Sequence, residues 1–584
     1  MKNKVIIYII TILFAVLAAV IGYGQIKSMD FTPFYFEVAA GEAKERIEYW
    51  ENANGDLYVF LPSYASMQEV YINLETSKDI FLNHELLSEG MSCEGYGLNE
   101  WYELAVGRAE HETTQKLMFV QSANVATMYI QTRSGDMDYI YRKKGNEESG
   151  NMTLYHTDGS VVFAGDMNSL KGRGNSTWTQ FEKKPFALKL ENAADLLGMG
   201  EAEKWILFAN ADDPSNMRNK MVYDYADAVG LPYSPDSQWV DLYLNGEYAG
   251  LYLLCERIEI HEERVDINAP DSSGSGSYIV SMEMAERMEE AGTSFVVTGM
   301  GQPLRINEPA KVSEELTNNI RTQWQSVENA ILAQDGIDPV SGKSYSELID
   351  LNSWVDKYLV EEIVASVDAC YLSQYFYSEG TDGGNVIYAG PVWDYDHAVA
   401  REEFLEPDAL IANRQFVKVG VYTPWFYNLY RKEEFYNRLR EVYADKHVEQ
   451  IEVLIEEKIP SYAEEIKVAS EINRIRWFGS SDETLDTEVA VMTKFLSERK
   501  EFLNSVWLEN REYYTVSVDS GLGGVFLYYA VSPGECMKEL PDLPEFDTMY
   551  FAGWYVKETN RAFDITQPIT GDTEIYAKWN AVNG

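Results

Sequence analysis

Two aspartates, Asp394 and Asp396, stand one residue apart in the segment GPVWDYD, residues 390–396. They end an apolar run, NVIYAGPVW, which predicts a strand. In an extended chain, side chains at positions i and i+2 point to the same face. Two carboxylates on one face suit Mg²⁺, which prefers oxygen ligands and shares them with the phosphates of a substrate. The alternative is a solvated acidic loop.

The same spacing also occurs in GDMD, where Asp136 and Asp138 follow the polar segment TRSG. This second pair sits in a predicted turn, with no element nearby that contains both glycine and lysine. Spacing alone therefore does not identify a metal site. The setting of Asp394 and Asp396, directly behind a strand, makes them the better candidates.

A basic, glycine-containing segment, LKGRGNSTWTQFEKKPFALKL, covers residues 170–190. Gly172 and Gly174 permit a ligand to approach the backbone closely, and Arg173 offers a planar fork of donors. Three lysines follow: Lys183, Lys184 and Lys189. Such a loop beside a strand lysine suits an anionic ligand such as phosphate. The alternative is a turn followed by a solvated basic edge strand.

A single aspartate, Asp368, follows an amphipathic helical pattern and precedes an aromatic strand pattern in SVDACYLSQYFYSEG. It could act as a base toward a hydroxyl group, or it could be a capping or surface residue. Phosphoryl transfer requires a cation on the phosphates, a carboxylate near the acceptor hydroxyl, and carboxylates for Mg²⁺. The basic segment, Asp368 and the later aspartate pair occur along the chain in an order that fits this division.

The elements that position these residues change in type along the chain. Residues from about 28 to 152 alternate in the manner of short strands. Residues from about 153 to 509 begin with strands, including a hairpin at Asn245–Gly246, and continue with helices. Strands return after Arg511. The helical patterns cover residues 215–230, 313–334, 351–367, 432–459 and 487–507. A strand-rich half followed by a helix-rich half indicates the α+β class.

Composition restricts the function. The 584 residues include 48 Lys plus Arg and 94 Asp plus Glu, a net charge of −46. This charge repels polyphosphate backbones, which argues against general nucleic-acid binding and favours cations or a basic partner. The length suggests roughly three or four domains. The four cysteines form no CxxC pair and there is no HExxH motif, which argues against a zinc site.

The N-terminus carries an uncharged apolar run from Val5 to about Tyr23, preceded by Lys2 and Lys4. Its length is close to the roughly 20 residues that a helix needs to cross a bilayer. The two lysines place the N-terminus on the cytoplasmic side. We expect an uncleaved membrane anchor, with the bulk of the chain outside the cytoplasm. A cleaved signal peptide, and hence secretion, is the alternative.

Together these segments resemble the CotH kinase family, the atypical kinases related to spore-coat protein H. The matching text runs from about residue 126 to 508 and includes LKGRGNSTW, KKPFALKL, RVDI, YIVSME and AGPVWDYD. The resemblance implies a divergent protein-kinase-like core, a strand-rich half plus a helix-rich half, that binds ATP and Mg²⁺. It also implies phosphorylation of Ser or Thr on a protein substrate.

The resemblance assigns roles to single residues. It implies Asp368 as the catalytic aspartate, and Asp394, supported by Asp396, as the metal ligand. It places four residues at the nucleotide: Arg173, Lys184, Lys189 and Glu256. Where members often carry Asn after the catalytic aspartate, this chain has Ser373 and Gln374, which can still bind a metal-bound water. After WDYD, His397 and Ala400 stand where members carry an apolar residue and reach a glycine.

We therefore expect four parts: a membrane segment at 1–24, an N-terminal β-domain at 28–125, a CotH kinase-like domain at 126–510 and a small β-domain at 513–584. The last part is similar to the Listeria–Bacteroides repeat of bacterial surface proteins. The expected function is a surface-exposed kinase that transfers phosphate from Mg-ATP to a protein. A non-catalytic surface scaffold that retains the fold is the main alternative, and a Mg²⁺-dependent phosphohydrolase is the weaker one.

Overall fold

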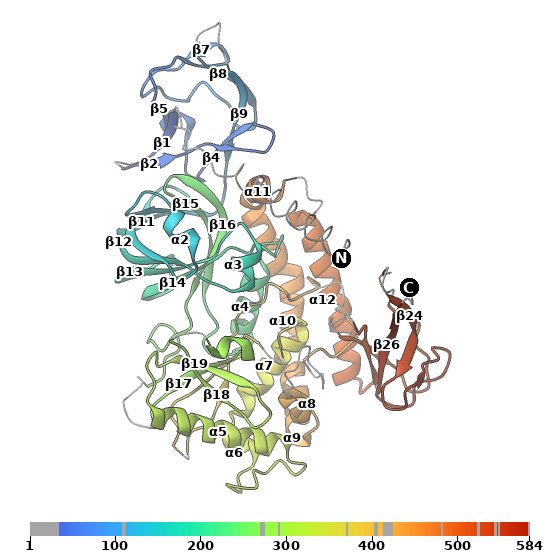
Figure 1. The fold of residues 1–584 in the computed structure, drawn as a ribbon. Coiled ribbons are helices and arrows are strands. Elements are labelled where there is room, and N and C mark those ends of the chain that lie inside the picture. The colour runs from blue at the N-terminus through green and yellow to red at the C-terminus, as the bar shows by residue number, and fades with distance from the viewer. Residues whose placement is uncertain are drawn as a thin grey trace, which may run out of the picture. The chain divides into compact units, whose positions relative to one another are not determined.

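The computed structural model describes these stretches of the chain: 34–41, 43–107, 113–268, 275–289, 292–369, 372–382, 384–401, 407–412, 424–479, 483–521, 526–541, 543, 546 and 549–581 (Figure 1). The chain divides into two compact units, residues 1–121 with 246–248, and residues 122–245 with 249–584. The predicted membrane segment lies outside the described residues. No described helix is both long and apolar enough to span a bilayer.

The first unit is built from short strands, as its alternating pattern predicts. A three-stranded sheet has the order β2 (Ala43–Ile47), β1 (Phe34–Ala40), β5 (Val70–Leu74). A six-stranded sheet has the order β3 (Trp50–Glu51), β4 (Leu57–Leu61), β9 (Thr113–Gln121), β8 (Trp101–Val106), β6 (Ile80–Leu82), β7 (Glu85–Leu86). Phe36 and Phe119 pack edge to face in its core, at 5.4 Å between ring centroids.

The second unit begins with a closed barrel. Its strands follow the order β10 (Ala126–Thr132), β11 (Glu147–Tyr155), β12 (Val161–Gly172), β13 (Phe186–Asp195), β14 (Glu201–Phe208), β16 (Glu247–Glu256), β15 (Ser237–Leu244). Parallel pairing of β10 with β15 closes it. Leu170, Leu188 and Trp205 are buried inside. Asn245 and Gly246 both have positive φ, which confirms the predicted hairpin turn.

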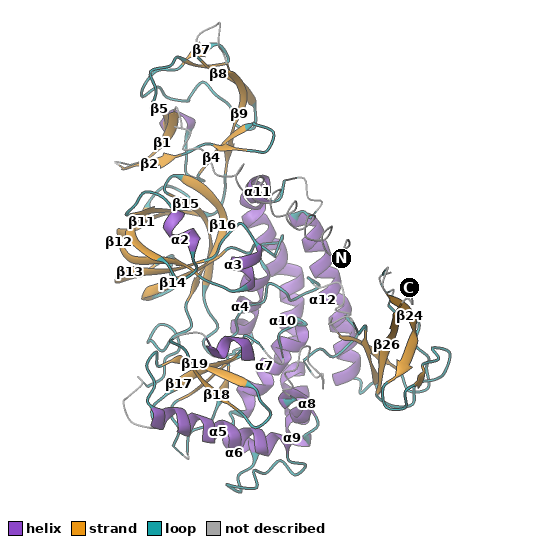
Figure 2. Cartoon of the chain, in the orientation of Figure 1, coloured by secondary structure: helices purple, strands orange, loops and turns teal. Residues whose placement is uncertain are grey.

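A second sheet lies within the helix-rich part, in the order β18 (Ser294–Val297), β19 (Pro303–Glu308), β17 (Tyr278–Met282), β20 (Tyr375–Ser378), β21 (Tyr388–Ala389). The main helices are α4 (Arg218–Ala228), α5 (Glu314–Leu332), α7 (Leu351–Ile363), α9 (Glu433–Val442), α10 (Val448–Val453), α11 (Ile459–Trp477) and α12 (Leu485–Trp507). Figure 2 shows these helices beside the barrel and the sheet. The α+β class is confirmed.

Buried aromatic side chains hold the helices against this sheet. Trp324 of α5 stacks on Trp425, at 5.2 Å between ring centroids, and Trp354 of α7 lies 5.0 Å from Phe376 of β20. Large aromatic rings contribute most of the apolar area that a core removes from water. This packing fixes the end of α7 relative to β20, and the segment that joins them carries Asp368.

The chain ends in a five-stranded sheet of order β23 (Phe526–Val531), β22 (Tyr514–Asp519), β26 (Thr573–Ala581), β24 (Met549–Val556), β25 (Arg561–Ala562). It has a core of its own around Val516, Trp554 and Ile575. The strands predicted after Arg511 are therefore present. The bounds predicted from the sequence for the four parts of the chain remain predictions.

Candidate functional site

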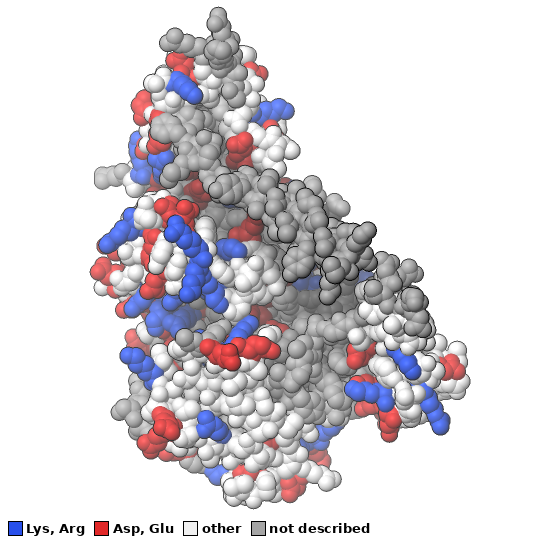
Figure 3. All heavy atoms as spheres, viewed as in Figure 1, with Lys and Arg blue, Asp and Glu red and all other residues white. Residues whose placement is uncertain are grey.

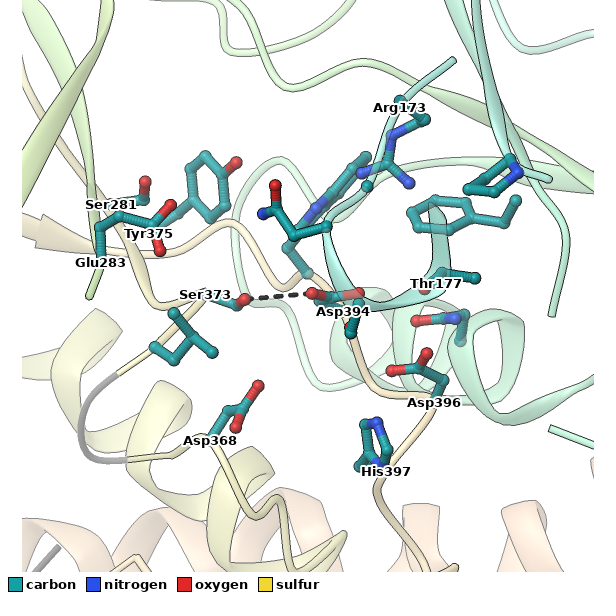
Figure 4. Close-up of a pocket in the computed structure, with 18 of the residues that line it drawn as sticks. Arg173, Thr177, Ser281, Glu283, Asp368, Ser373, Tyr375, Asp394, Asp396 and His397 are labelled. Atoms are coloured by element: carbon teal, nitrogen blue, oxygen red, sulfur yellow. Dashed lines mark hydrogen bonds between the residues drawn. The ribbon is translucent and has the colours of Figure 1, made fainter. Parts of the chain in front are cut away.

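A cavity of about 440 Å³ in the second unit is lined by the loop after β12, the end of β14, the start of α4, the β17–β19–β20 sheet and the segment after β21. Four of the residues singled out from the sequence line it: Arg173, Asp368, Asp394 and Asp396. Figure 4 shows these four side chains around one space. They come from positions up to 223 residues apart (396 − 173).

The glycine-containing loop is held between β12 and β13. Arg173 N donates to Pro185 O at 3.0 Å, and Gly174 has φ +73°, a conformation that favours glycine. A Cβ on Gly172 would lie 2.2 Å from the ring of Trp178, so a side chain there is incompatible with this packing. The glycines therefore serve the shape of the loop, which directs Arg173 toward the cavity.

The Arg173 guanidinium lies over two aromatic rings, 4.5 Å from the Phe208 centroid and 5.5 Å from that of Trp393. Within the described part of the chain, no carboxylate forms a salt bridge with it. Lys144, also at the cavity, donates to Asn175 Oδ1 at 2.7 Å. Two cations without carboxylate partners among the described residues, in a chain of charge −46, favour an anionic ligand.

Tyr395, the residue between the two aspartates, anchors their segment to the buried core. Tyr395 N donates to Asn219 Oδ1 of α4 at 2.7 Å, and the Tyr395 hydroxyl donates to Glu361 of α7. Lys357 completes this buried group, donating to the Tyr395 hydroxyl at 3.0 Å and pairing with Glu361 at 2.9 Å. Tyr395 is buried, and its two neighbours, Asp394 and Asp396, line the cavity.

The backbone at this point differs from the extended chain that the strand pattern predicts. Asp394 has φ +70°, in the left-handed region that non-glycine residues seldom adopt. Its N–H approaches the Tyr223 hydroxyl of α4 at 3.4 Å. The two aspartates share the cavity because α4 and α7 hold the segment, and not because the strand continues.

Asp394 and Asp396 have different surroundings. Ser373 Oγ donates to Asp394 Oδ2 at 3.1 Å, and it lines the cavity, whereas the cavity lining does not include Gln374 (Figure 4). Burial, together with the charges of Asp394, Asp368 and Asp213, raises the pKa of Asp396 to about 7. Like charges this close favour a bound cation, which would offset their repulsion.

The donor set at this point fits Mg²⁺. Among the described residues, no group of three His, Cys, Asp or Glu side chains is arranged to hold a metal alone. Mg²⁺ is usually held by one or two carboxylates together with substrate phosphates and waters, and dedicated protein cages are uncommon. Asp394 and Asp396 supply the two carboxylates, and the nearby hydroxyl of Ser373 supplies a further oxygen.

Asp368 lies in the turn that follows α7, as the sequence predicts. Ala365 has φ +50°, which ends the helix, and Asp368 O accepts from Leu372 N at 3.2 Å. The half-buried carboxylate faces the same cavity as Asp394 (Figure 4). This position suits a base that meets a hydroxyl group entering the cavity.

A buried arginine fixes the chain just after the aspartate pair. Arg218, at the start of α4, donates through Nε to Ala398 O at 3.0 Å and through Nη2 to Val399 O at 3.3 Å. It pairs with Asp213 at 2.5 Å and with Glu488 of α12 at 2.8 Å. Val399 has φ +49°, which is strained for a β-branched residue, and these contacts hold it there.

Three residues predicted at the nucleotide lie outside the cavity lining. Lys184 donates to Trp178 O, within the short helix α3 (Ser176–Gln180), at 2.6 Å and also to Phe181 O, just after that helix. Glu256 pairs with Arg264 at 2.6 Å. Lys189 pairs with Glu203 at 3.2 Å, and 44% of its side chain is exposed. Figure 3 shows the barrel surface carrying mixed acidic and basic side chains.

Replacing Lys189 by Met should leave folding and nucleotide binding almost unchanged. An exposed ion pair of this kind contributes about 0–1 kcal/mol to the free energy of unfolding. Arg173→Met, in contrast, should weaken nucleotide binding because it removes an arginine that lines the cavity. Isothermal titration with Mg-ATP checks both variants. Equal losses of affinity in the two variants would place the phosphates at β13 instead.

Asp136 and Asp138 have the same spacing as Asp394 and Asp396, but the structure places them in a different setting. Both side chains are exposed, and Asp136 Oδ1 accepts from Asp138 N at 2.9 Å at the start of α2 (Asp138–Arg142). This is a local turn interaction. The same spacing therefore gives a surface turn in one place and a cavity lining in the other.

The sequence patterns gave no role to several cavity residues: Asn219, Ser281, Tyr375 and Arg305. Asn219 had one local signal, since it stands in the polar stretch Arg218–Lys220 of a helix whose first turns are fully buried. The others come from strands β17, β19 and β20, and their local sequence does not show that they face a cavity.

A family model described as CotH kinase protein matches residues 170–503. The matched region includes every residue named above as lining the cavity except Lys144. A comparison with curated proteins found no match. Since the match covers more than half of the 584 residues, the chain belongs to the CotH kinase protein family.

Proposed function

We propose that this protein transfers the terminal phosphoryl group of Mg-ATP to a Ser or Thr hydroxyl of a protein substrate. The single observation that carries the proposal is the convergence of Arg173 with Asp368, Asp394 and Asp396 in one cavity. Membership of a kinase family supports the reaction class. The chemistry requires a cation at the phosphates and carboxylates on the opposite side, and the cavity has both.

In the proposed reaction the acceptor oxygen attacks the terminal phosphorus. The bond from that phosphorus to the bridging oxygen of ADP breaks, and ADP leaves with the bond electrons. Asp368 accepts the proton of the attacking hydroxyl. Arg173 neutralises charge on the phosphate oxygens, and its contacts with Phe208 and Trp393 keep it oriented before substrate arrives.

Asp394 and Asp396 would hold Mg²⁺, and a bound Mg²⁺ supplies positive charge to the phosphate oxygens. The protein's own contribution is to keep the two carboxylates in place. Tyr395, Asn219 and Glu361 do this from the buried side of the segment.

The test is transfer of label from γ-labelled ATP to protein by the purified full-length chain, with an Asp368→Asn variant. We expect the variant to bind Mg-ATP normally but to transfer roughly 10²–10⁴-fold more slowly, the usual contribution of a positioned base. If the wild type neither binds nucleotide nor transfers label, the kinase function is excluded and the non-catalytic scaffold is the remaining function. Release of label only as free phosphate would indicate a hydrolase. Equal rates in both forms would exclude Asp368 as the base.

We also propose that the protein is anchored in the cell membrane with its bulk outside the cytoplasm. The apolar run after Lys2 and Lys4, and the likeness of the C-terminal part to a surface-protein repeat, support this location. Protease added to intact cells should remove the folded units. Protection from protease until the cells are lysed would contradict the location.

A further inference from the structure

The charge balance of the cavity differs from that of the chain. Four cationic residues line it, Lys144, Arg173, Arg287 and Arg305, against four acids, Glu283, Asp368, Asp394 and Asp396. The whole chain has 48 Lys plus Arg against 94 Asp plus Glu. Acidic residues therefore outnumber basic residues in the chain as a whole, whereas the cavity lining has equal numbers of the two. A lining with equal numbers of basic and acidic residues repels an anionic ligand less than the acidic chain as a whole does.

Two of these cations, Arg173 and Arg305, come from different elements of the fold. Arg173 belongs to the loop after β12, whereas Arg305 belongs to β19 of the second sheet. Arg305 is the direct cross-strand neighbour of Ser281 on β17, and Ser281 is that of Tyr375 on β20. Direct neighbours across antiparallel strands point to the same face. The three side chains therefore form one row, and all three line the cavity.

Figure 4 shows how this row lies relative to the other groups. Ser281 and Tyr375 are on one side of Asp394, and Arg173 is on the other. Tyr375 also lies against the ring of Trp393, over which the Arg173 guanidinium is placed, so the Tyr375 end of the row is close to Arg173. If the polyphosphate chain runs from Arg173 to the carboxylates, Arg305 on β19 remains available to a different anionic group.

The row is equipped to bind an anion. No described carboxylate forms a salt bridge with Arg305, whereas the neighbouring Arg287 is paired with Glu283 at 2.6 Å. Asn307 Nδ2 donates to Ser281 Oγ at 2.8 Å, which leaves the hydroxyl proton of Ser281 to be donated elsewhere. The Tyr375 hydroxyl, which also lines the cavity, is a further donor.

We propose that Arg305, Ser281 and Tyr375 form a second anion subsite, which binds a carboxylate or phosphate group of the phosphoryl acceptor. The acceptor is then an acidic or already phosphorylated segment next to the Ser or Thr. This inference rests on the proposed kinase function. An acidic acceptor differs from the basic substrate that the net charge of the chain suggests. The net charge describes the whole chain, whereas the subsite consists of three residues at one place.

The test uses three serine peptides of equal length whose flanking residues are Asp, Ala or Lys. The wild type should prefer the Asp peptide in kcat/KM. Arg305→Gln should reduce the ratio of the Asp to the Ala peptide by roughly 10- to 100-fold, the usual effect of removing a charge-assisted hydrogen bond. Arg305→Glu should shift the preference to the Lys peptide. Arg321→Gln, an exposed arginine of α5 outside the cavity lining, is the matched control and should change no ratio.

The outcomes separate the possible sources of the anion. An increase in the KM for ATP by the same factor with every peptide would assign Arg305 to the nucleotide and overturn the proposal. So would a wild type that prefers the Ala or Lys peptide. If no peptide accepts phosphate, the kinase function fails, and fluorescence anisotropy of the labelled Asp peptide without ATP tests the subsite alone. Weaker binding by Arg305→Gln then supports the subsite, and equal binding overturns it.

Discussion

Asp394→Asn should abolish Mg²⁺-dependent phosphoryl transfer while leaving the protein folded. The substitution keeps the shape of the side chain and its contact with Ser373 but removes the charge that would hold the cation. Loss of metal stabilisation of a transition state costs several kcal/mol, and about 3 kcal/mol corresponds to a rate loss of more than 100-fold. The thermal shift that Mg-ATP produces in the wild type should also disappear.

Asp138→Asn is the matched control for this prediction, because Asp138 has the same spacing from its partner aspartate but lies exposed in a surface turn. Its transfer rate and thermal shift should equal those of the wild type. A variant at position 394 that still shows the Mg-ATP shift would place the metal elsewhere. Asp396→Asn should then be the variant that loses it.

Arg218→Met should destabilise the fold more than any other single substitution at the site. Arg218 is fully buried, and its removal leaves Asp213 and Glu488 without a cationic partner in a low-dielectric interior. Breaking a buried ion pair by deleting one partner costs about 3–5 kcal/mol of the free energy of unfolding. Urea denaturation, followed by far-ultraviolet circular dichroism, measures the change.

Two comparisons make this result interpretable. Arg438→Met removes an arginine that is 39% exposed and paired with Glu441, so it should cost less than about 1 kcal/mol. Adding Asp213→Asn to Arg218→Met should recover part of the loss, because the second substitution removes one of the charges left unpaired. A loss below about 1 kcal/mol for Arg218→Met alone would contradict the role assigned to this ion pair.

The same arginine connects stability to the site. Its guanidinium holds the carbonyls of Ala398 and Val399, which follow the aspartate pair directly. Because Val399 has positive φ, the segment relaxes to another backbone conformation when these contacts are lost. Arg218→Met should therefore lower kcat even at temperatures where the variant is folded.

The strands and helices were largely predictable, because their signal is local. Alternation predicted β4, β5, β9 and β10, and the 3.6-residue period predicted α5, α7 and α12. Strands β18 and β19 were not predicted. β19 begins with Pro303, a residue that counts against a strand pattern, and β18 has only four residues. A short apolar strand leaves too few residues for a period to emerge.

The acidic half of the site was predictable for a different reason. Asp368, Asp394 and Asp396 each follow a recognisable element, and the family resemblance assigned them roles that their shared cavity supports. The basic half was predicted only in part. Arg173 lines the cavity, while Lys189 and Lys184 have partners elsewhere. A lysine in an alternating strand looks the same whether its face meets solvent or a ligand.

The sequence by itself determined the family and the α+β class, and it singled out the three aspartates most suited to phosphoryl transfer. Only the tertiary structure decided which charged residues share one space. Asp136 and Asp394 begin pairs of identical spacing, yet the first pair ends in a solvated turn and the second faces a cavity held by Tyr395. The row of Arg305, Ser281 and Tyr375 depends on strand register, which joins residues about 24 and 94 positions apart. Spacing acts over a few residues, whereas burial and electrostatic attraction act between whichever side chains the fold brings together.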